Sequence, residues 1–160
     1  MKTLTFTTNS YNHTVELGET IAKSLLPGQG ILLTGDLGAG KTTIISGICK
    51  TLGYTGHVKS PTFVIAWLYE GNHPIYHVDL YRLDDYCELE NIGWEEMTDE
   101  SRIYLVEWAD KFELPFTADA LKLFLEYGDN PDSRKITVEY NERTYPHLEK
   151  DLLEYENNRN

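Results

Sequence analysis

The sequence is poor in cysteine and contains no long apolar run. Its 160 residues include 2 cysteines, Cys49 and Cys87, and no Cys-x-x-Cys pair, which argues against a disulfide framework and against a cysteine-based zinc site. The longest apolar run, residues 63–69, is far shorter than the roughly 20 residues that span a membrane. The first residues lack the apolar core of a signal peptide. We therefore expect a soluble, intracellular protein, located in the cytoplasm, with no membrane partner.

Basic residues are also scarce. Lysine and arginine total 14 against 26 aspartates and glutamates, so the formal net charge is −12. A protein that holds nucleic acid by itself needs a basic face that replaces the counterions on the phosphates. The charge therefore argues against a large nucleic-acid-binding face, and DNA is not an expected partner. A local basic patch remains compatible with this composition.

The most informative stretch is residues 35–43, Gly-Asp-Leu-Gly-Ala-Gly-Lys-Thr-Thr. It matches the phosphate-loop (P-loop, or Walker A) pattern of Gly, any four residues and Gly-Lys-Thr. Its glycines permit a tight turn that points backbone N–H groups at phosphate oxygens. Lys41 would contact the β- and γ-phosphates, and the Thr42 hydroxyl would hold Mg²⁺. The pattern predicts a nucleoside triphosphate site formed by Asp36, Leu37, Gly38, Ala39, Gly40, Lys41, Thr42 and Thr43.

The flanks of this loop fit the pattern. Residues 31–34, Ile-Leu-Leu-Thr, are a short apolar run that indicates a buried strand. After the loop, Ile44, Ile48 and Leu52 recur every four residues, and Gly53 stands where a helix would stop. A P-loop joins a strand to a helix whose positive N-terminal end favours anions. The context therefore favours nucleotide binding over a Gly-rich turn without a ligand.

The remaining elements follow from alternation, apolar runs and turn residues. We expect further strands at 4–8, 62–69, 75–79, 103–106, 121–127 and 135–140. We also expect three more helices. The first is capped by Asn9 or Ser10 and has Leu25 on its apolar stripe, the second covers 86–97 and is broken near Gly93, and the last is capped by Thr144. The turns at 71–72 and 128–133 indicate two hairpins. The predicted fold is a three-layer α/β, P-loop NTPase-like domain with a mixed β-sheet. We assign residues 1–150 to this single P-loop ATPase domain, and residues 151–160 to the end of a C-terminal helix and a frayed acidic tail.

A P-loop works with a carboxylate at the end of another buried strand, which holds Mg²⁺ directly or through water. Glu107 follows the apolar run 103–106, and Asp79 follows residues 75–78, a run that a histidine interrupts. One acid would hold the metal, and the other would orient or deprotonate the attacking water. The residues alone do not assign the two roles. Each acid is alternatively an ordinary surface residue at a strand end.

Four further features have two interpretations each. The segment 60–63, Ser-Pro-Thr-Phe, is either an ordinary loop or a switch that the γ-phosphate orders. Arg82 either neutralises phosphate charge or forms a structural salt bridge. His77 shares a strand face with Asp79, and a core histidine oriented by its neighbour is a simpler interpretation than a metal pair, because no third ligand is evident. Trp108 either belongs to the core or supports the site.

These pieces, taken in order, resemble the TsaE family (also called YjeE), small bacterial ATPases needed for threonylcarbamoyladenosine in tRNA. The matching segments are residues 35–43, residues 60–63, residues 77–83 (His-Val-Asp-Leu-Tyr-Arg-Leu) and residues 106–108 (Val-Glu-Trp). The P-loop alone is unspecific, but its combination with the other segments in this spacing is specific. The resemblance covers the chain from about the first strand to Trp108.

The resemblance implies functions beyond those inferred from the residues. Family members bind and slowly hydrolyse ATP with Mg²⁺, and they act with the TsaB–TsaD pair that transfers the threonylcarbamoyl group to the adenosine next to the anticodon. ATP turnover is expected to reset that assembly, and an acidic subunit would reach tRNA through these partners. Carried over by position, Lys41, Asp79 and Glu107 are the catalytic residues. Thr42 and Glu107 hold Mg²⁺, Asp79 is the hydrolysis-side acid, and Trp108 stands near the nucleotide.

The sequence also departs from the family pattern. Many members carry an arginine a few residues after the loop threonines, where this chain has Ser46-Gly47, so a basic contact from this helix to a partner or RNA is not carried over. The motifs end near Pro115, and the acidic C-terminal helix has no counterpart among them. Two other functions share a P-loop: a small-molecule kinase, which usually has an Arg-rich lid that this sequence lacks, and a nucleotide-gated binding module with incidental hydrolysis. A GTPase would need an Asn-Lys-x-Asp segment, which this sequence also lacks.

Overall fold

The computed structural model describes residues 1–61 and 64–159. No helix within these ranges is long and apolar enough to cross a membrane. In chain order the elements are β1 (Lys2–Thr8), α1 (Tyr11–Ala22), β2 (Gly30–Gly35), α2 (Lys41–Thr51), β3 (Ala66–Glu70), β4 (Pro74–Asp79), α3 (Tyr86–Asn91), α4 (Trp94–Met97), β5 (Ile103–Glu107), the 3-10 turn η1 (Ala109–Lys111), β6 (Leu121–Tyr127), β7 (Arg134–Tyr140) and α5 (Leu148–Arg159).

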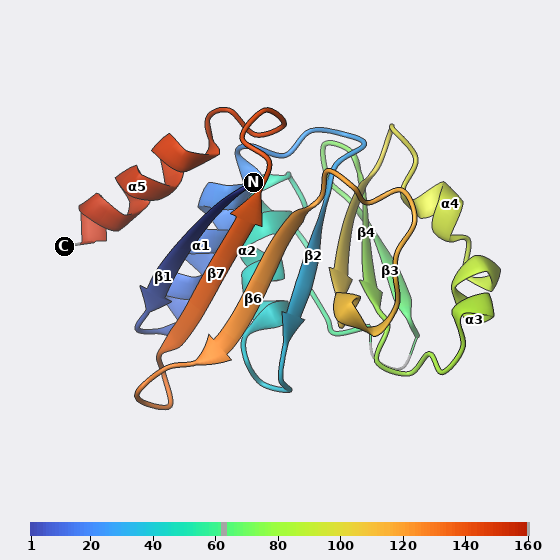
Figure 1. The fold of residues 1–160 in the computed structure, drawn as a ribbon, viewed down its shortest axis with the longest axis horizontal. Helices are drawn as coiled ribbons and strands as arrows, with labels where there is room; N and C mark the ends of the chain where they lie inside the picture. Colours follow the sequence, from blue (N-terminus) through green and yellow to red (C-terminus); the bar gives the residue numbers. More distant parts are fainter. Residues whose placement is uncertain (62–63, 160) are drawn as a thin grey trace.

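Among the described residues, seven strands form one sheet in the order β1-β7-β6-β2-β5-β4-β3 (Figure 1). Strand β2 lies at the centre and runs parallel to its neighbours β5 and β6, and β4 runs parallel to β5. The pairs β3–β4, β6–β7 and β1–β7 are antiparallel. The predicted mixed sheet is confirmed, because each predicted hairpin adds an antiparallel pair to a parallel centre.

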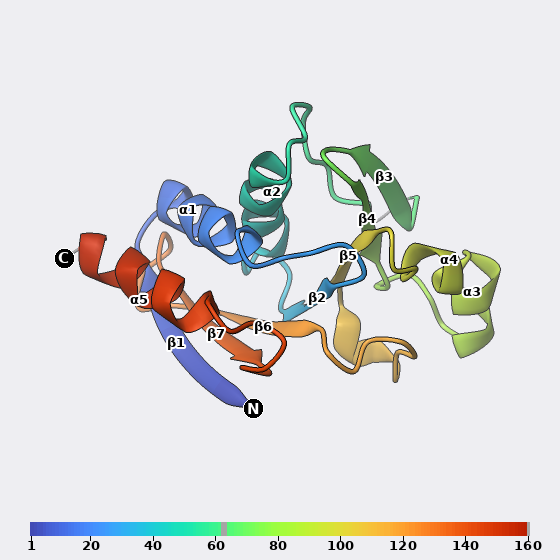
Figure 2. The ribbon, with the colours of Figure 1, turned by 90° about the horizontal axis from the view of Figure 1, so that it is seen from above.

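The helices cover the two faces of the sheet unequally. Helices α1, α2 and α5 pack on one face, whereas α3, α4 and η1 pack on the other, over β4, β5 and β2 only (Figure 2). Side chains alternate accordingly along the central strand, where Ile31 and Leu33 face α1 and α2 while Leu32 faces the opposite side. The fold is therefore α/β, with a full layer of helices only on the side that carries α2.

Glycines bring α1 and α2 into close contact. A Cβ atom added at Gly47 would lie 2.1 Å from the carbonyl oxygen of Val15, and one at Gly18 would lie 2.3 Å from the carbonyl oxygen of Ile44. Because no side chain fits at either position, the two helix backbones lie against each other. This contact helps to fix the N-terminal end of α2 at the edge of the sheet.

Several predicted ends of elements are confirmed. Ser10 caps α1, since its hydroxyl oxygen accepts a hydrogen bond from the His13 N–H at 3.2 Å. Leu25 is buried as expected, although the helix itself ends at Ala22. Gly53 follows α2 with a φ of 92°, and Gly93 separates α3 from α4 with a φ of 84°. Glycine adopts such left-handed conformations without a steric penalty.

Two element boundaries differ from the prediction. The strand predicted over 62–69 is shorter, because β3 begins only at Ala66; Thr62 and Phe63 lie outside the described residues. The last helix begins at Leu148 rather than next to Thr144, whose hydroxyl instead contacts Asp119 Oδ1 at 3.5 Å. Pro146 explains the delay, since a residue that precedes proline avoids the helical conformation.

The C-terminal residues also differ from the predicted frayed tail. Helix α5 continues to Arg159, whose guanidinium donates hydrogen bonds to the Thr7 carbonyl at 3.2 Å, the Tyr155 hydroxyl at 2.7 Å and His13 Nδ1 at 2.8 Å. The Tyr155 hydroxyl in turn donates to the His13 carbonyl at 2.9 Å. These contacts join the last turn of α5 to β1 and to the start of α1. The acidic composition of the tail gives no sign of them, because they depend on the fold.

Candidate functional site

The P-loop residues connect β2 to α2 at the edge of the sheet where the central parallel strands end (Figure 1). Gly38 and Gly40 have φ values of 80° and 104°, in the region that favours glycine. Helix α2 begins at Lys41, and the Ile44 N–H donates to the Gly40 carbonyl at 3.0 Å. The predicted order of strand, loop and helix is therefore confirmed. The first N–H groups of α2, which have no partner within the helix, lie next to the loop.

The β6–β7 hairpin supports this loop from outside. The Tyr127 hydroxyl donates to the Leu37 carbonyl at 2.6 Å, and Arg134 Nη2 donates to the Gly38 carbonyl at 3.1 Å. A Cβ atom at Gly38 would come within 2.5 Å of the Tyr127 hydroxyl oxygen, so a side chain at this position would displace the end of Tyr127. Neither Tyr127 nor Arg134 was predicted to take part in the site, because no local motif marks residues that reach the loop from a distant hairpin.

Lys41 is buried among hydrogen-bond acceptors. Its ammonium group donates to the carbonyl of Gly35 and, at 3.0 Å, to the carbonyl of Asp36. The same nitrogen lies 4.3 Å from the centroid of the Trp108 ring, in the geometry of a cation–π contact. Burial lowers the pKa of Lys41, because it penalises the ammonium form, and the nearby carboxylates of Glu107 and Asp79 oppose that shift.

Asp79 and Glu107 end two adjacent parallel strands. In the β4–β5 register Asp79 lies opposite Glu107, and the two residues are only 2% and 4% exposed. Thr42 Oγ1 lies 3.2 Å from Glu107 Oε1 and 3.3 Å from Oε2, and donates a hydrogen bond to this carboxylate. The structure therefore brings both predicted acids and the P-loop threonine to one place. Their burial excludes the alternative that either acid is an ordinary surface residue.

His77 is fully buried and uses both ring nitrogens. Its Nε2 lies 2.6 Å from Glu107 Oε2, and its Nδ1 lies 2.9 Å from the Tyr69 hydroxyl. That hydroxyl also contacts the Lys59 backbone, at 3.3 Å from the nitrogen and 3.1 Å from the carbonyl oxygen. His77 is thus a core histidine, as expected, but its partner is Glu107 on the neighbouring strand rather than Asp79 on its own strand. Tyr69 and Lys59 carry no motif in the sequence, so neither was predicted to take part in the site.

The segment predicted as a loop or switch starts beside this group. Ser60 is exposed and Pro61 is buried, whereas Thr62 and Phe63 lie outside the described residues. Further along, Ile65 has a φ of 75°, a left-handed conformation that costs about 1–2 kcal/mol. Its carbonyl accepts a hydrogen bond from the Asp79 N–H at 2.8 Å. Backbone groups therefore connect Lys59, before the segment, to Tyr69 on β3, and Ile65, after it, to β4, the strand that carries Asp79.

The donor atoms at this place suit a hard cation. Thr42 and Glu107 offer oxygen atoms, which Mg²⁺ prefers. Within residues 1–61 and 64–159, no group of three or more His, Cys, Asp and Glu residues could hold a metal ion. A Mg²⁺ ion that is held with a nucleotide does not need such a group, because phosphates and waters supply most of its ligands. The residues present therefore fit Mg²⁺ bound together with phosphates, and they do not fit an all-protein metal site.

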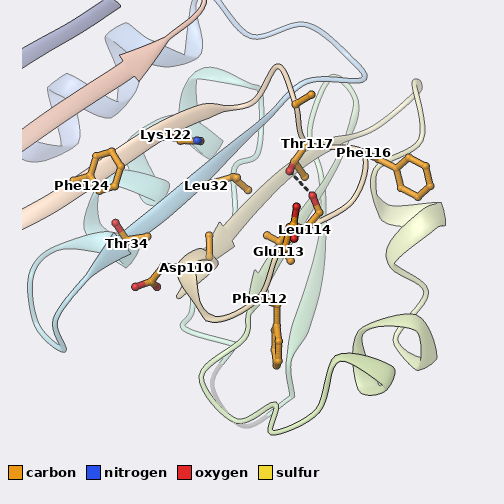
Figure 3. A pocket seen from close by; sticks show the side chains of 12 residues that line it. Leu32, Thr34, Asp110, Phe112, Glu113, Leu114, Phe116, Thr117, Lys122 and Phe124 are labelled. Carbon is orange, nitrogen blue, oxygen red and sulfur yellow. Dashed lines mark hydrogen bonds between the residues drawn. The ribbon is translucent and has the colours of Figure 1, made fainter. Parts of the chain in front are cut away.

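Two of the cavities in this part of the molecule lie on opposite faces of the sheet. One, of about 740 Å³, runs along α2 and is lined by Thr42 and Thr43 together with residues from the start of α1 and from the loop 53–58. The other, of about 520 Å³, lies on the opposite face of the sheet, between β2, β6 and the loop after β5, where Leu32, Lys122 and Phe124 line it (Figure 3). None of the predicted site residues, all of which the structure describes, lines the second cavity. It is therefore separate from the Thr42–Glu107 contact.

Comparison with known proteins agrees with the resemblance drawn from the motifs. A family model described as "Threonylcarbamoyl adenosine biosynthesis protein TsaE" matches residues 8–153 of this chain. The match continues well beyond Pro115, where the recognisable motifs end, and it reaches into α5. The similarity therefore includes the C-terminal part of the chain, which the motifs left unassigned.

Individual proteins support the same conclusion. The "tRNA threonylcarbamoyladenosine biosynthesis protein TsaE" of Bacillus subtilis is 35% identical over 158 residues, which is 98% of each chain. The protein of the same name from Nostoc sp. is 40% identical over 121 residues, 72% of this chain and 74% of that protein. The crystal structure of Bacillus subtilis YdiB superposes with a TM-score of 0.79 at 31% identity and 97% coverage of each chain. The α/β fold predicted from the sequence is thereby confirmed, and the chain belongs to the TsaE family of threonylcarbamoyladenosine biosynthesis proteins.

Proposed function

We propose that this chain is a Mg²⁺-dependent, ATP-binding subunit with slow ATPase activity that is required for threonylcarbamoyladenosine modification of tRNA, at the adenosine next to the anticodon. Family membership supports the role in this modification. The observation that carries the nucleotide-dependent part is the 3.2 Å contact between Thr42 Oγ1 and Glu107 Oε1 beside the P-loop. A P-loop threonine next to a buried strand-end acid is the arrangement that holds Mg²⁺ against the β- and γ-phosphates.

The loop and Lys41 bind the phosphates. Backbone N–H groups of residues 36–43 and the positive end of α2, equivalent to about half an elementary charge, face the anion. Lys41 exchanges the carbonyls of Gly35 and Asp36 for phosphate oxygens, which accept charge-assisted hydrogen bonds more strongly. The Trp108 ring lies beside this ammonium group and therefore stands next to the nucleotide once Lys41 has moved to the phosphates.

The two acids have separate roles. Glu107 belongs to the metal side, because it contacts Thr42. Asp79 lies one strand further from β2, and it is the hydrolysis-side acid that orients or deprotonates the attacking water. The Tyr81 N–H donates to Asp79 Oδ1 at 2.9 Å, which restricts rotation of that carboxylate. When Mg²⁺ is bound, it supplies neutralisation of the charge on the β- and γ-phosphates.

The partners of this subunit are a TsaB-like and a TsaD-like protein. The net charge of −12 disfavours tRNA binding by this chain alone, because released counterions supply much of the free energy of such binding. The chain therefore reaches tRNA indirectly, through the complex. We place it in the cytoplasm, with neither a membrane nor a DNA partner.

The test is ATP hydrolysis by the chain alone, then with the TsaB-like and TsaD-like proteins, each with and without tRNA. We expect slow turnover that rises when the partners are added, and the Glu107→Gln variant should lose the increase. Turnover that is indifferent to the partners but accelerated by a small-molecule acceptor would favour a P-loop kinase. Nucleotide binding without turnover in any mixture would favour a nucleotide-gated binding module.

A further inference from the structure

We infer that His77 is a positioning residue that fixes the Glu107 carboxylate toward Thr42, and that Tyr69 connects His77 to the backbone of Lys59. This inference rests on the proposed function, because it concerns the metal-side acid of a nucleotide site. The residues come from four separate parts of the chain: α2, the loop after it, the β3–β4 hairpin and β5. Their hydrogen bonds form one continuous series, in which the two bonds of His77 are buried and the bonds of Thr42 and Lys59 are partly buried.

The direction of these hydrogen bonds follows from the chemistry of each group. An ionised carboxylate only accepts hydrogen bonds, so His77 Nε2 carries the hydrogen that bonds Glu107 Oε2 at 2.6 Å. An uncharged ring then accepts at Nδ1, and the Tyr69 hydroxyl donates to it at 2.9 Å. The Lys59 N–H donates to the Tyr69 hydroxyl oxygen at 3.3 Å, and the Lys59 carbonyl, at 3.1 Å, is a second acceptor within reach of that hydroxyl.

The bond from His77 makes the two Glu107 oxygens inequivalent. Thr42 Oγ1 is almost equally far from both oxygens, at 3.2 and 3.3 Å, so Thr42 alone does not fix the rotation of the carboxylate. His77 bonds Oε2 and so fixes the plane of a carboxylate whose two oxygens both lie within 3.3 Å of Thr42 Oγ1. The groups that bond a metal-ligating carboxylate from behind typically change metal affinity by about 10- to 100-fold when they are removed. His77 therefore holds the Glu107 carboxylate in the orientation in which it faces Thr42, on the Mg²⁺ side.

The same series of bonds reaches the segment that begins at Ser60. Lys59 precedes that residue directly, and its backbone bonds Tyr69 rather than a strand partner. A displacement of the backbone at Lys59 would therefore act on Tyr69 and His77 before it acts on Glu107. If His77 only filled the core, replacing its N–H donor toward Glu107 would not change the effect of Mg²⁺ on ATP affinity. The positioning role predicts that it does.

The test uses His77→Leu, His77→Gln and Tyr69→Phe, with His73→Leu as a control that removes an exposed histidine from the turn before β4. ATP affinity is measured by calorimetry in EDTA and in Mg²⁺, and the ratio of the two affinities gives the gain due to Mg²⁺. We expect His77→Leu to keep the affinity measured in EDTA and to lose about tenfold or more of the gain. His77→Gln should keep most of the gain, because its amide N–H replaces Nε2. Tyr69→Phe should lose part of the Mg²⁺-dependent gain in ATP affinity. His73→Leu should lose none of it.

Each outcome decides between a positioning role for His77 and a purely structural role in the core. An unchanged gain in His77→Leu, or an equal loss in His77→Leu and His77→Gln, would overturn the positioning role. If His77→Leu does not fold, the Tyr69→Phe variant decides. A Mg²⁺-dependent gain equal to that of the wild type would overturn the proposed series of hydrogen bonds, and a reduced gain would support it. A wild-type chain that shows no ATP binding or no gain from Mg²⁺ would instead reject the proposed function itself. The two failures are therefore distinguishable.

Discussion

The ammonium nitrogen of Lys41 lies 4.3 Å from the centroid of the Trp108 ring. The two residues come from the first turn of α2 and from the position directly after β5. Trp108 has a left-handed φ of 58°, and its ring lies 5.0 Å from that of Tyr81, centroid to centroid. The indole is thus held beside the P-loop lysine from a separate strand, and its fluorescence should report where that ammonium group lies.

We predict a saturable change in tryptophan emission when ATP and Mg²⁺ are added, because Lys41 leaves the indole face to meet the phosphates. A fluorescence titration measures it. The Trp108→Phe variant should lose the change, whereas Trp67, on β3, and Trp94, whose indole N–H bonds the Pro115 carbonyl at 2.9 Å, should contribute only a constant background. Retention of the full change in Trp108→Phe would contradict the prediction.

Lys41→Ala should weaken ATP binding by at least about tenfold, to near loss, because a hydrogen bond to a charged group contributes about 1.5–3 kcal/mol. Calorimetric titration of ATP against the variant gives the affinity. Lys50→Ala is the matched control, since Lys50 lies on the same helix, is exposed and pairs with Glu19 at 3.1 Å. An ATP affinity in Lys41→Ala equal to that of the control would reject the P-loop assignment.

Local patterns in the sequence were sufficient for the P-loop and for most of the strands, although β3 begins only at Ala66. The run at 31–34 and the four-residue spacing of Ile44, Ile48 and Leu52 gave β2 and α2, because apolar periodicity directly reflects which face is buried. The ends of two apolar runs likewise indicated Asp79 and Glu107 as candidate acids of the site, and the structure places them opposite each other. Parallel strands that end at the same edge of a sheet bring their last residues to the same side of the molecule.

Contacts between distant segments were not predictable in this way. Tyr127 and Arg134 reach the P-loop from the β6–β7 hairpin, and Tyr69 reaches His77 across a strand pair. Such pairs depend on the strand order, which the sequence alone did not provide. The C-terminal tail shows the same limitation, since its acidic composition suggested fraying whereas Arg159 bonds residues near the N-terminus.

The two acids should respond differently to Mg²⁺. We expect Asp79→Ala and Glu107→Ala both to slow ATP hydrolysis, and only Glu107→Ala to require a much higher Mg²⁺ concentration, because Glu107 is the acid that contacts Thr42. Hydrolysis rates measured over a range of Mg²⁺ concentrations check this. Superimposable metal titrations of the two variants would refute the division of roles.

The two cysteines should differ in reactivity. Burial raises the pKa of Cys49 to about 12, whereas Cys87 is exposed and has a pKa raised chiefly by the carboxylate of Asp85. A thiol reagent should therefore label Cys87 in the folded protein and Cys49 only after unfolding. The rate at Cys87 should rise with pH to a midpoint above the ordinary value of about 8.5. Asp85→Asn should lower that midpoint, and an unmoved midpoint would contradict the assigned cause.

The same shift at Cys49 predicts a loss of stability in alkali. Because its pKa is raised in the folded state, the fold favours the neutral thiol, and this contribution is complete below the pKa of the unfolded chain. It falls as the pH rises from about 8.5 toward about 12. Urea unfolding between these pH values should show a smaller decline in Cys49→Ala than in the wild type. An equal decline in both proteins would exclude Cys49 as a contributor.

Gly47→Ala should destabilise the protein, although alanine is intrinsically about 1 kcal/mol better than glycine within a helix. The added Cβ would lie 2.1 Å from the carbonyl oxygen of Val15, so the backbones of α1 and α2 would have to separate. Overpacking of this kind typically costs about 1–3 kcal/mol. Ser46→Ala, at the half-exposed neighbouring position, should stay within about 0.5 kcal/mol of the wild type. Thermal unfolding of both variants measures the difference, and a more stable Gly47→Ala protein would show that intrinsic helix preference, and not the contact between α1 and α2, governs this position.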